Sequence, residues 1–214
     1  MTQNTAPSLR TRLREARKNM VVADRQRGSL LIRARLFTWL ALAREQALLS
    51  KQNVPQVIAA YWPLSDEPDL TPLIEKWVHE VDHPAITVVL PVVVSDDAPL
   101  HFYPYTELTE LKPGQFGVMA PVPYQGQTSL IPDVVLVPTL GFTKQGDRIG
   151  YGKGFYDRTL ALLRQQNPKM VAIGIAWNEG SIEAIERQYQ PAPHDFALNY
   201  VLTPTDWWPA RQPP

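Results

Sequence analysis

Short and almost uninterrupted apolar runs constrain the fold of this chain most strongly. Each run is four to nine residues long and most are rich in Val and Ile, which is typical of strands buried in a sheet. Segments with helical spacing separate them, at residues 71–80 and 155–165. Strands that alternate with helices predict an α/β fold, in which helices flank a mostly parallel or mixed central sheet. The predicted buried strands are 57–61, 86–94, 134–137 and 170–177, with weaker strands at 100–105 and 200–202.

The N-terminal part of the chain predicts a basic helical segment. Residues 8–19 are expected to form a short helix with Leu9 and Leu13 on one side. A longer helix follows, with Asp24 as its expected N-cap. Its expected buried residues recur at helical spacing and are Leu30, Ala34, Phe37, Ala41 and Leu48.

This N-terminal segment carries an excess of positive charge. Residues 1–50 hold ten Arg and Lys against three acids, in a chain whose formal net charge is zero. Such a segment is typical of a protein with an anionic partner, but also of a solvated helical face. An Arg-rich start with few acids is typical of an organellar transit peptide as well. Composition leaves these three interpretations open.

Length and composition also indicate the number of domains and the cellular compartment. A length of 214 residues suits one full core, so we expect one domain over residues 1–214, with flexible ends at 1–7 and 209–214. The absence of cysteine excludes disulfides, thiolate catalysis and cysteine-bound metal sites. No run approaches 18 apolar residues, and no apolar segment follows a basic start. We therefore expect a cytoplasmic protein without a membrane span.

A glycine-rich segment, Arg148 to Arg158 (RIGYGKGFYDR), predicts a phosphate-binding loop. Glycines at every second position let backbone N–H groups surround an anion, and Lys153 adds a positive charge. The segment precedes a predicted helix, whose N-terminus favours phosphate. A Walker A loop would need Lys-Ser/Thr after its second glycine, and a dinucleotide loop would follow its strand directly. Neither pattern is present, and by spacing alone a plain turn before a helix remains an alternative.

Charged neighbours favour the phosphate-binding interpretation. Arg148 and Lys153 supply two cations for a polyphosphate. Asp157 can hold Mg²⁺ together with phosphate oxygens. This combination is suited to Mg-ATP.

A second segment, Tyr61 to Asp69, places an aromatic side chain and acids after a predicted buried strand. Open α/β sheets bind ligands at the carboxyl ends of their strands. Glu67 can accept paired hydrogen bonds from an amino-substituted heterocycle, while Trp62 supplies a flat apolar wall. The alternative is a helix N-terminal turn in which the helix dipole favours acids.

The segment His79 to His83 matches the His-Glu-x-x-His pattern of zinc proteases. That chemistry needs both histidines on one face of a continuing helix. Pro84 follows directly and disfavours helical geometry at His83. A helix end is therefore the favoured interpretation.

Taken together, these residues resemble the 5-formyltetrahydrofolate cyclo-ligase family. The main motif combines Leu136-Val137-Pro138, Gly141-Phe142, Gly146 and Arg148 to Arg158. Further similarity lies in Arg10 with Leu13-Arg14, in Tyr61 to Asp69, in Val89 to Val92, in Phe116-Gly117, and in His194-Asp195 with Val201-Leu202-Thr203. The resemblance spans nearly the whole chain. Ala120, Thr143 and Asn199 depart from the family pattern, and Arg10 stands where lysine is common.

The resemblance implies an enzyme that uses ATP and Mg²⁺ to convert 5-formyltetrahydrofolate into 5,10-methenyltetrahydrofolate, ADP and phosphate. It implies the catalytic residues Lys153, Arg148 and Tyr151 and the metal ligands Asp157 and Asp195. Its implied ATP-binding residues are Arg10, Arg14, Arg148, Gly150, Gly152, Lys153, Gly154, Tyr156 and Asp157. Its implied folate-binding residues are Trp62, Glu67, Tyr151, Gly152 and Phe155.

The expected partner is this small molecule, with or without a polyglutamate tail, and the expected state is a monomer that binds neither nucleic acid nor membrane. Two alternatives remain beside the enzyme. One is a diverged paralogue that binds ATP and folate for another pathway. The other is an RNA- or nucleotide-binding module that uses the basic N-terminal segment, although aromatic-rich motifs for single strands are not evident.

Overall fold

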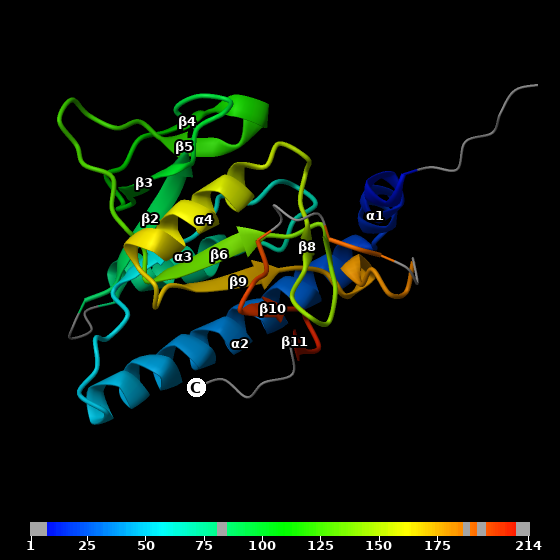
Figure 1. Cartoon of the computed structure of the whole chain (residues 1–214), viewed down its shortest axis with the longest axis horizontal. Helices are drawn as coiled ribbons and strands as arrows, with labels where there is room; N and C mark the ends of the chain where they lie inside the picture. The colour runs from blue at the N-terminus through cyan, green and yellow to red at the C-terminus, as the bar shows by residue number, and fades with distance from the viewer. Residues whose placement is uncertain (1–7, 81–84, 186–188, 192–195, 209–214) are drawn as a thin grey trace, which may run out of the picture.

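A computed structural model describes residues 8–80, 85–185, 189–191 and 196–208. Its centre is a seven-stranded sheet in the order β11-β10-β9-β6-β1-β2-β3 (Figure 1). The strands are β1 (Val57–Ala59), β2 (Thr87–Val92), β3 (His101–Pro104), β6 (Val134–Pro138), β9 (Val171–Ile175), β10 (Tyr200–Leu202) and β11 (Trp207–Trp208). The predicted strands all appear. Most are shorter than the apolar runs, because the runs continue beyond the paired residues.

The sheet is parallel in its centre and antiparallel at both edges. β1 pairs in parallel with β2 and β6, and β9 pairs in parallel with β6 and β10. The edge strands β3 and β11 run antiparallel to their neighbours. The predicted α/β class is confirmed. The strand order reverses between β1 and β6. β2 and β3 follow β1 on one side of it, and β6 then pairs with β1 on the other side.

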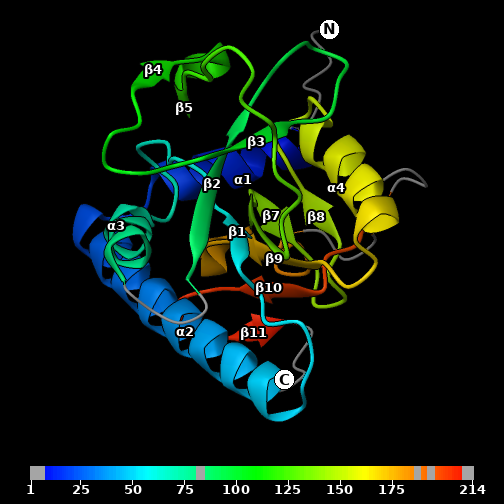
Figure 2. The same cartoon turned by 90° about the vertical axis from the view of Figure 1, so that its left-hand side faces the viewer.

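Helices cover both faces of this sheet. α2 (Val22–Leu49) and α3 (Thr71–His79) pack on one face, and α4 (Phe155–Gln166) packs on the other. Figure 2 shows α3 to the left of the strands, α2 along their lower left, and α4 to the right. None of the helices over the described ranges has both the length and the apolar content that crossing a membrane requires.

The predicted buried face of α2 is largely wrong: of its five residues only Phe37 packs against the core, and it is partly buried. Leu30 and Leu48 are among the exposed large apolar residues, and Ala34 and Ala41 are exposed as well. The buried residues are Gly28, Ser29, Ile32, Leu36, Trp39, Leu40, Arg44 and Ala47. The sequence of α2 has apolar residues on every side, so spacing alone does not select one face.

The start of α2 also differs from the prediction. The helix begins at Val22 after the N-cap Val21, which makes no side-chain capping hydrogen bond. Asp24 lies inside the first turn instead of capping it. Its carboxylate is still well placed there, because the N-terminus of a helix favours negative charge.

Two short hairpins form separate two-stranded sheets beside the central one, and periodicity did not predict either of them. β4 (Leu111–Pro113) pairs with β5 (Met119–Pro121), with the 3₁₀ turn Gln115–Gly117 between them. β7 (Gly141–Phe142) pairs with β8 (Arg148–Ile149) and leads into the glycine-rich loop. Strands of two or three residues are too short for a recognisable alternation.

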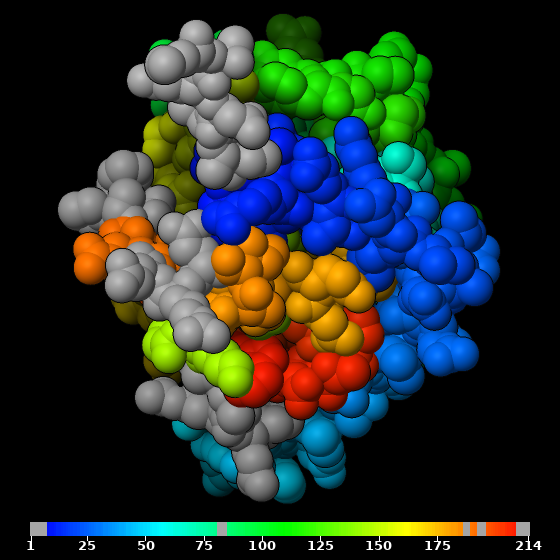
Figure 3. Space-filling model, turned by 90° about the vertical axis from the view of Figure 1, so that its right-hand side faces the viewer, coloured from blue at the N-terminus to red at the C-terminus, as the bar shows by residue number. Residues whose placement is uncertain are grey.

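The first helix, α1 (Leu9–Lys18), lies against the β7–β8 hairpin. Ser8 caps it by accepting a hydrogen bond from the Thr11 backbone N–H. Leu13 is 1% exposed and packs in a cluster with Leu140, Ile149 and Ile182. Figure 3 shows α1 on the surface beside the 3₁₀ turn Asn178–Gly180, which it contacts. Leu13 therefore anchors α1 on the hairpin.

We expect Leu13→Ala to lower the free energy of unfolding by about 2–5 kcal/mol, because it leaves a cavity between α1 and the hairpin. Denaturant unfolding measures this loss. Leu108→Ala is the control, because Leu108 is 96% exposed, and we expect its effect to stay within about 0.5 kcal/mol. Equal stabilities of the two variants would show that α1 is not anchored through Leu13.

Candidate active site

The main cavity lies at the carboxyl ends of the central strands, where the strand order reverses. It has a volume of about 780 Å³. Tyr61 and Trp62 line it just after β1, Val92 at the end of β2, and Pro138 at the end of β6. A reversal of strand order opens a crevice at this edge of an α/β sheet, and ligands bind there. The topology therefore creates the cavity.

The glycine-rich loop forms one wall of the cavity and leads into α4. Gly152 has φ +99°, a conformation that a residue with a side chain rarely adopts. A Cβ atom on Gly150 would lie 2.4 Å from the Arg148 Nη1 atom, so only glycine lets the guanidinium approach. Gly154 is the N-cap of α4 and makes no side-chain capping bond. The first backbone N–H groups of α4 thus remain free of a side-chain cap, which suits an anion.

Two arginines of α1 hold this loop from outside. The Arg10 Nε donates to the Gly150 carbonyl at 2.9 Å, and an Arg14 Nη donates to the Tyr151 carbonyl at 3.3 Å. Both side chains line the cavity and are exposed. Their charges therefore stand beside the loop amides, as expected for a phosphate site.

The two cations of the loop differ in their surroundings. Lys153 is exposed, and its Nζ lies 5.5 Å from the centre of the Phe116 ring. Arg148 is 7% exposed and donates to Asp157 at 2.7 Å. Its buried Nε has no hydrogen-bond partner within the part of the chain that the structure describes. The predicted phosphate ligand Arg148 and the predicted metal ligand Asp157 are thus paired with each other.

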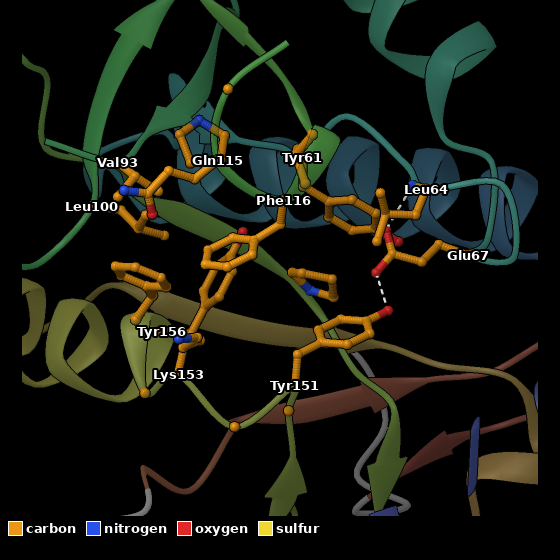
Figure 4. Close-up of a pocket in the computed structure, with 18 of the residues that line it drawn as sticks. Tyr61, Leu64, Glu67, Val93, Leu100, Gln115, Phe116, Tyr151, Lys153 and Tyr156 are labelled. Carbon is orange, nitrogen blue, oxygen red and sulfur yellow. Dashed lines mark hydrogen bonds between the residues drawn. The ribbon is translucent and has the colours of Figure 1, made fainter. Parts of the chain in front are cut away.

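Glu67 forms a polar end of the cavity, where it meets Tyr151 of the glycine-rich loop (Figure 4). It is 7% exposed, its Oε1 accepts a hydrogen bond from the Tyr151 hydroxyl, and its Oε2 accepts the Leu64 backbone N–H at 2.9 Å. Burial raises the pKa of Glu67, although the bonds from Tyr151 and Leu64 and the nearby Arg17 oppose that rise.

Burial also raises the pKa of Tyr151 and of Tyr156, and the charge of Glu67 adds to both shifts. Both hydroxyls therefore stay protonated at neutral pH.

Arg17 of α1 was missed among the candidate residues. It is 3% exposed, donates to the Tyr151 hydroxyl, and donates to the Thr139 carbonyl at 2.9 Å. A signal was present, because Arg10, Arg14 and Arg17 recur at i, i+4 and i+7 on one side of the predicted helix. Arginines are rarely buried, so the sequence favoured solvent exposure.

An apolar wall lines another part of the cavity. Phe116, at the tip of the β4–β5 hairpin, is the central side chain of Figure 4 and has φ +61°, which is unusual for a residue with a side chain. Its ring centre lies 6.3 Å from that of Phe155. Leu100 and Val93 complete this wall. The pocket-facing role of Phe116 was missed, because it depends on the unpredicted hairpin.

All the candidate residues that the structure describes line this cavity, including Trp62, Gly152, Phe155 and Tyr156. Trp62 also packs edge-on against Tyr105, with ring centres 5.8 Å apart. Asp195, the second predicted metal ligand, lies outside the described residues. The sequence therefore predicted which distant segments would meet at one site.

No ready-made metal cluster is found among the described residues, in the sense of three His, Cys, Asp or Glu side chains grouped together. Only the first residue of the zinc-protease pattern, His79, lies in a helix, because α3 ends there and Glu80 is extended. The Nδ1 of His79 instead lies 2.6 Å from a Glu107 carboxylate oxygen. His83 lies outside the described residues. The interpretation as a helix end is confirmed for His79.

The sequence matches the 5-formyltetrahydrofolate cyclo-ligase family over residues 2–204. The chain belongs to this family. A 5-formyltetrahydrofolate cyclo-ligase of Mycolicibacterium smegmatis is 29% identical over 210 residues, covering 95% of this chain and 96% of the relative. That of Haemophilus influenzae is 26% identical over 191 residues, covering 86% and 92%. The resemblance deduced from the motifs is confirmed, and with it the prediction of a cyclo-ligase-type enzyme.

Solved structures agree with this membership. The 5,10-methenyltetrahydrofolate synthetase of Aquifex aeolicus superposes with a TM-score of 0.69 at 26% identity, covering 95% of this chain and 92% of that one. The synthetase of Mycoplasma pneumoniae has a TM-score of 0.61 at 22% identity, covering 92% and 96%, and supports the fold.

Besides Arg10, three residues depart from the cyclo-ligase pattern, and they fall in different places. The Thr143 hydroxyl donates to Asp147 at 2.8 Å, in the turn between β7 and β8. Asn199 accepts hydrogen bonds from Ala172 at 2.8 Å and Arg164 at 2.9 Å. These two residues stabilise local structure outside the cavity lining. Ala120 of β5 does line the cavity, so it is the one of these three that can affect a ligand.

A methyl group on Gly152 is expected to weaken this cyclo-ligase site. Gly152→Ala would strain the loop and place a Cβ 3.3 Å from the Arg10 guanidinium, so we expect turnover at limiting ATP to fall about tenfold. Gly126→Ala is the matched control, because Gly126 also has positive φ but no atom within 4 Å of its Cβ position. Steady-state kinetics measures both, and equal rates would exclude a role for the loop conformation.

Proposed function

We propose that this chain catalyses the ATP-dependent ring closure of 5-formyltetrahydrofolate to 5,10-methenyltetrahydrofolate, with release of ADP and phosphate. The observation that carries the proposal is that one cavity is lined both by the glycine loop with its cations and by the buried Glu67. The proposed phosphate site and the proposed acceptor for an amino-substituted ring would then share one cavity. Membership of the cyclo-ligase family supports the same reaction.

The chemistry explains why both sites are needed. A formamide oxygen is a very poor leaving group, so attack of N10 on the formyl carbon stalls. Transfer of the γ-phosphoryl group of ATP to that oxygen gives ADP and creates a good leaving group. N10 then bonds to the carbon and loses its proton, the carbon–oxygen bond breaks, and phosphate carries the oxygen away. The protein mainly has to position the partners and neutralise charge.

We assign the phosphates of ATP to the glycine-loop end of the cavity. The loop amides at Gly150, Gly152 and Gly154 and the N-terminus of α4 would bind phosphate oxygens. Lys153, Arg10 and Arg14 would supply positive charge, with Arg148 behind them. The exposed position of Lys153 supports a direct contact with the transferring group.

Mg²⁺ bound with ATP would shield the phosphate oxygens and orient the γ-phosphoryl group. Such an ion takes one or two protein carboxylates and phosphate oxygens as ligands, so a site without a three-residue cluster fits it. Asp157, in the first turn of α4, is the carboxylate that fits this role. Asp157 also pairs with Arg148, and this ion pair would reduce the negative charge that Asp157 offers to Mg²⁺. Asp195 stays a proposed second ligand.

We assign the pterin ring to the Glu67 end. A carboxylate that already accepts two protein hydrogen bonds retains lone pairs for ring N–H groups. Trp62, Phe155 and the Tyr151–Gly152 segment would frame the ring, and Tyr151 and Tyr156 stay neutral beside it. Action as a monomer stays a prediction. A cytoplasmic location stays a prediction.

The test is a turnover assay that follows the absorbance of methenyltetrahydrofolate with Mg²⁺, ATP and 5-formyltetrahydrofolate. We expect a rate that depends on ATP and is matched by phosphate release. No product with both substrates and Mg²⁺ present would contradict the proposal.

The second candidate is a paralogue with another folate substrate, which the cavity position of Ala120 favours. Competition between 5-formyltetrahydrofolate and other folates in the same assay separates the two. A folate that binds and reacts in preference to the 5-formyl compound would favour the paralogue. The RNA-binding alternative is less well supported, because Arg10 and Arg14 bind the loop carbonyls.

A further inference from the structure

Arg17 differs from the other two arginines on the same side of α1. Arg10 and Arg14 are exposed and line the cavity, whereas Arg17 is buried and stands behind the lining residue Tyr151. Its guanidinium carbon lies 5.7 Å from the centre of the Tyr151 ring. A buried arginine must be paired to be tolerated, so its partners indicate what it does.

The guanidinium group of Arg17 joins two parts of the fold. One nitrogen donates to the carbonyl of Thr139, a buried residue that directly follows β6, at 2.9 Å. The other donates to the Tyr151 hydroxyl and lies 3.9 Å from Glu67 and 4.0 Å from Asp66. The planar fork of arginine can satisfy both directions at once, unlike the single ammonium of lysine.

The direction of the hydrogen bonds follows from these partners. Arginine has donors and no acceptor, so the Tyr151 hydroxyl must accept from Arg17. The one hydroxyl proton is then left for Glu67, whose Oε1 accepts it, while Oε2 accepts the Leu64 N–H. Two accepted hydrogen bonds favour the ionised form of the carboxyl group. Its plane is fixed, because both bonds come from ordered groups.

We propose that Arg17 is a positioning residue for the folate substrate, which acts through the Tyr151 hydroxyl to keep Glu67 an oriented anion facing the cavity. This inference rests on the proposed function, in which Glu67 binds the pterin ring. Arg17 itself stands outside the set of lining residues, so it would not touch the substrate.

The groups around Glu67 determine how its charge responds to the loss of Arg17. These titratable groups come from five parts of the fold. Asp66 lies in the same loop as Glu67, and Tyr61 follows β1. The others are Tyr151 of the glycine loop, Tyr156 of α4 and Arg17 of α1. Burial raises the pKa of Glu67 and Asp66 raises it further, while Arg17 is the positive charge that opposes them. Without Arg17 the carboxyl group would be protonated at a higher pH.

The experiment measures binding of 5-formyltetrahydrofolate without ATP, from acid to alkaline pH, together with KM for each substrate. For Arg17→Met we expect a folate affinity about tenfold to a hundredfold lower at neutral pH. We expect its acid limb to move about one pH unit or more upward. The affinity should recover at higher pH, because binding needs ionised Glu67. KM for ATP should stay nearly constant.

Three further variants identify the route of the effect. Arg17→Lys keeps the charge, so its acid limb should stay in place while affinity falls, since lysine cannot hold both Thr139 and Tyr151. Tyr151→Phe keeps Arg17 and removes the connecting hydroxyl, so it should weaken folate binding without a large effect on ATP. Lys18→Met removes a positive charge from the exposed neighbouring position of α1 and should behave like wild type.

The outcomes separate this proposal from its alternatives. If Arg17→Met and Arg17→Lys bind folate with the affinity and pH profile of Lys18→Met, the proposal is wrong. An equal and pH-independent loss for folate and ATP would mean that Arg17 merely holds α1, which also overturns it. Should Arg17→Met fail to fold, Arg17→Lys and Tyr151→Phe still decide. A wild type that binds no 5-formyltetrahydrofolate would contradict the proposed function itself.

Discussion

Lys153→Met is expected to lower kcat by about 10²- to 10³-fold while the protein stays folded. Lys153 lies on the proposed phosphate loop, and no acidic side chain in the described ranges forms an ion pair with it. Its charge is therefore available to the transferring phosphoryl group, where a positioned cation has a large effect on rate. Methionine keeps much of the side-chain volume, so the change removes mainly charge.

Rapid-mixing and steady-state kinetics measure this loss, with circular dichroism to verify the fold. Lys169→Met is the matched control, because Lys169 is exposed and lies outside the cavity lining. We expect its kcat to equal that of wild type. A near-normal kcat for Lys153→Met would mean that the phosphoryl group is transferred elsewhere.

Glu67→Gln is expected to lower kcat/KM for 5-formyltetrahydrofolate by about 10²-fold or more, chiefly through KM. A carboxylate accepts charge-assisted hydrogen bonds, whereas an amide offers one acceptor and presents an NH₂ group to the ring. A site built to hydrogen-bond a ligand loses strongly when the pairing is wrong. The exposed Glu45→Gln on α2 is the control.

The pH dependence gives this prediction a second measurement. Burial raises the pKa of Glu67, so wild-type folate binding should fall on acidification at a higher pH than for an ordinary glutamate. The acid limb should be absent in Glu67→Gln. Folding stability depends on pH in the opposite direction. The contribution of Glu67 to the free energy of unfolding is largest below its pKa in the unfolded chain, and it declines as pH rises through its raised pKa in the folded protein. An unchanged acid limb in Glu67→Gln would assign the limb to another group.

The strands and the fold class were predictable because their signal is local. Continuous runs such as Val134 to Val137 are buried by helices on both faces, so composition reveals them. The face of α2 was not predictable, since Ile32 and Leu30 are equally apolar but only Ile32 is buried. The packing of the sheet makes that choice, and the sequence of one helix does not contain it.

The location of the candidate site was predictable where residue type and chemistry coincide, since the glycine loop and Glu67 line one cavity. It was not predictable where partners decide the role. Arg17 is one more basic residue in a basic segment until Thr139 and Tyr151 surround it. Phe116 reaches the cavity only through a hairpin with two short strands.

The central claim is that ATP activates the formyl oxygen inside this cavity, and an isotope measurement tests it most directly. 5-Formyltetrahydrofolate labelled with ¹⁸O in the formyl group is turned over with Mg-ATP, and the released phosphate is analysed by mass spectrometry. If that oxygen is phosphorylated and then leaves, each phosphate carries one ¹⁸O atom, in step with methenyltetrahydrofolate formation. Product formed with unlabelled phosphate, or without ATP consumption, would contradict the account.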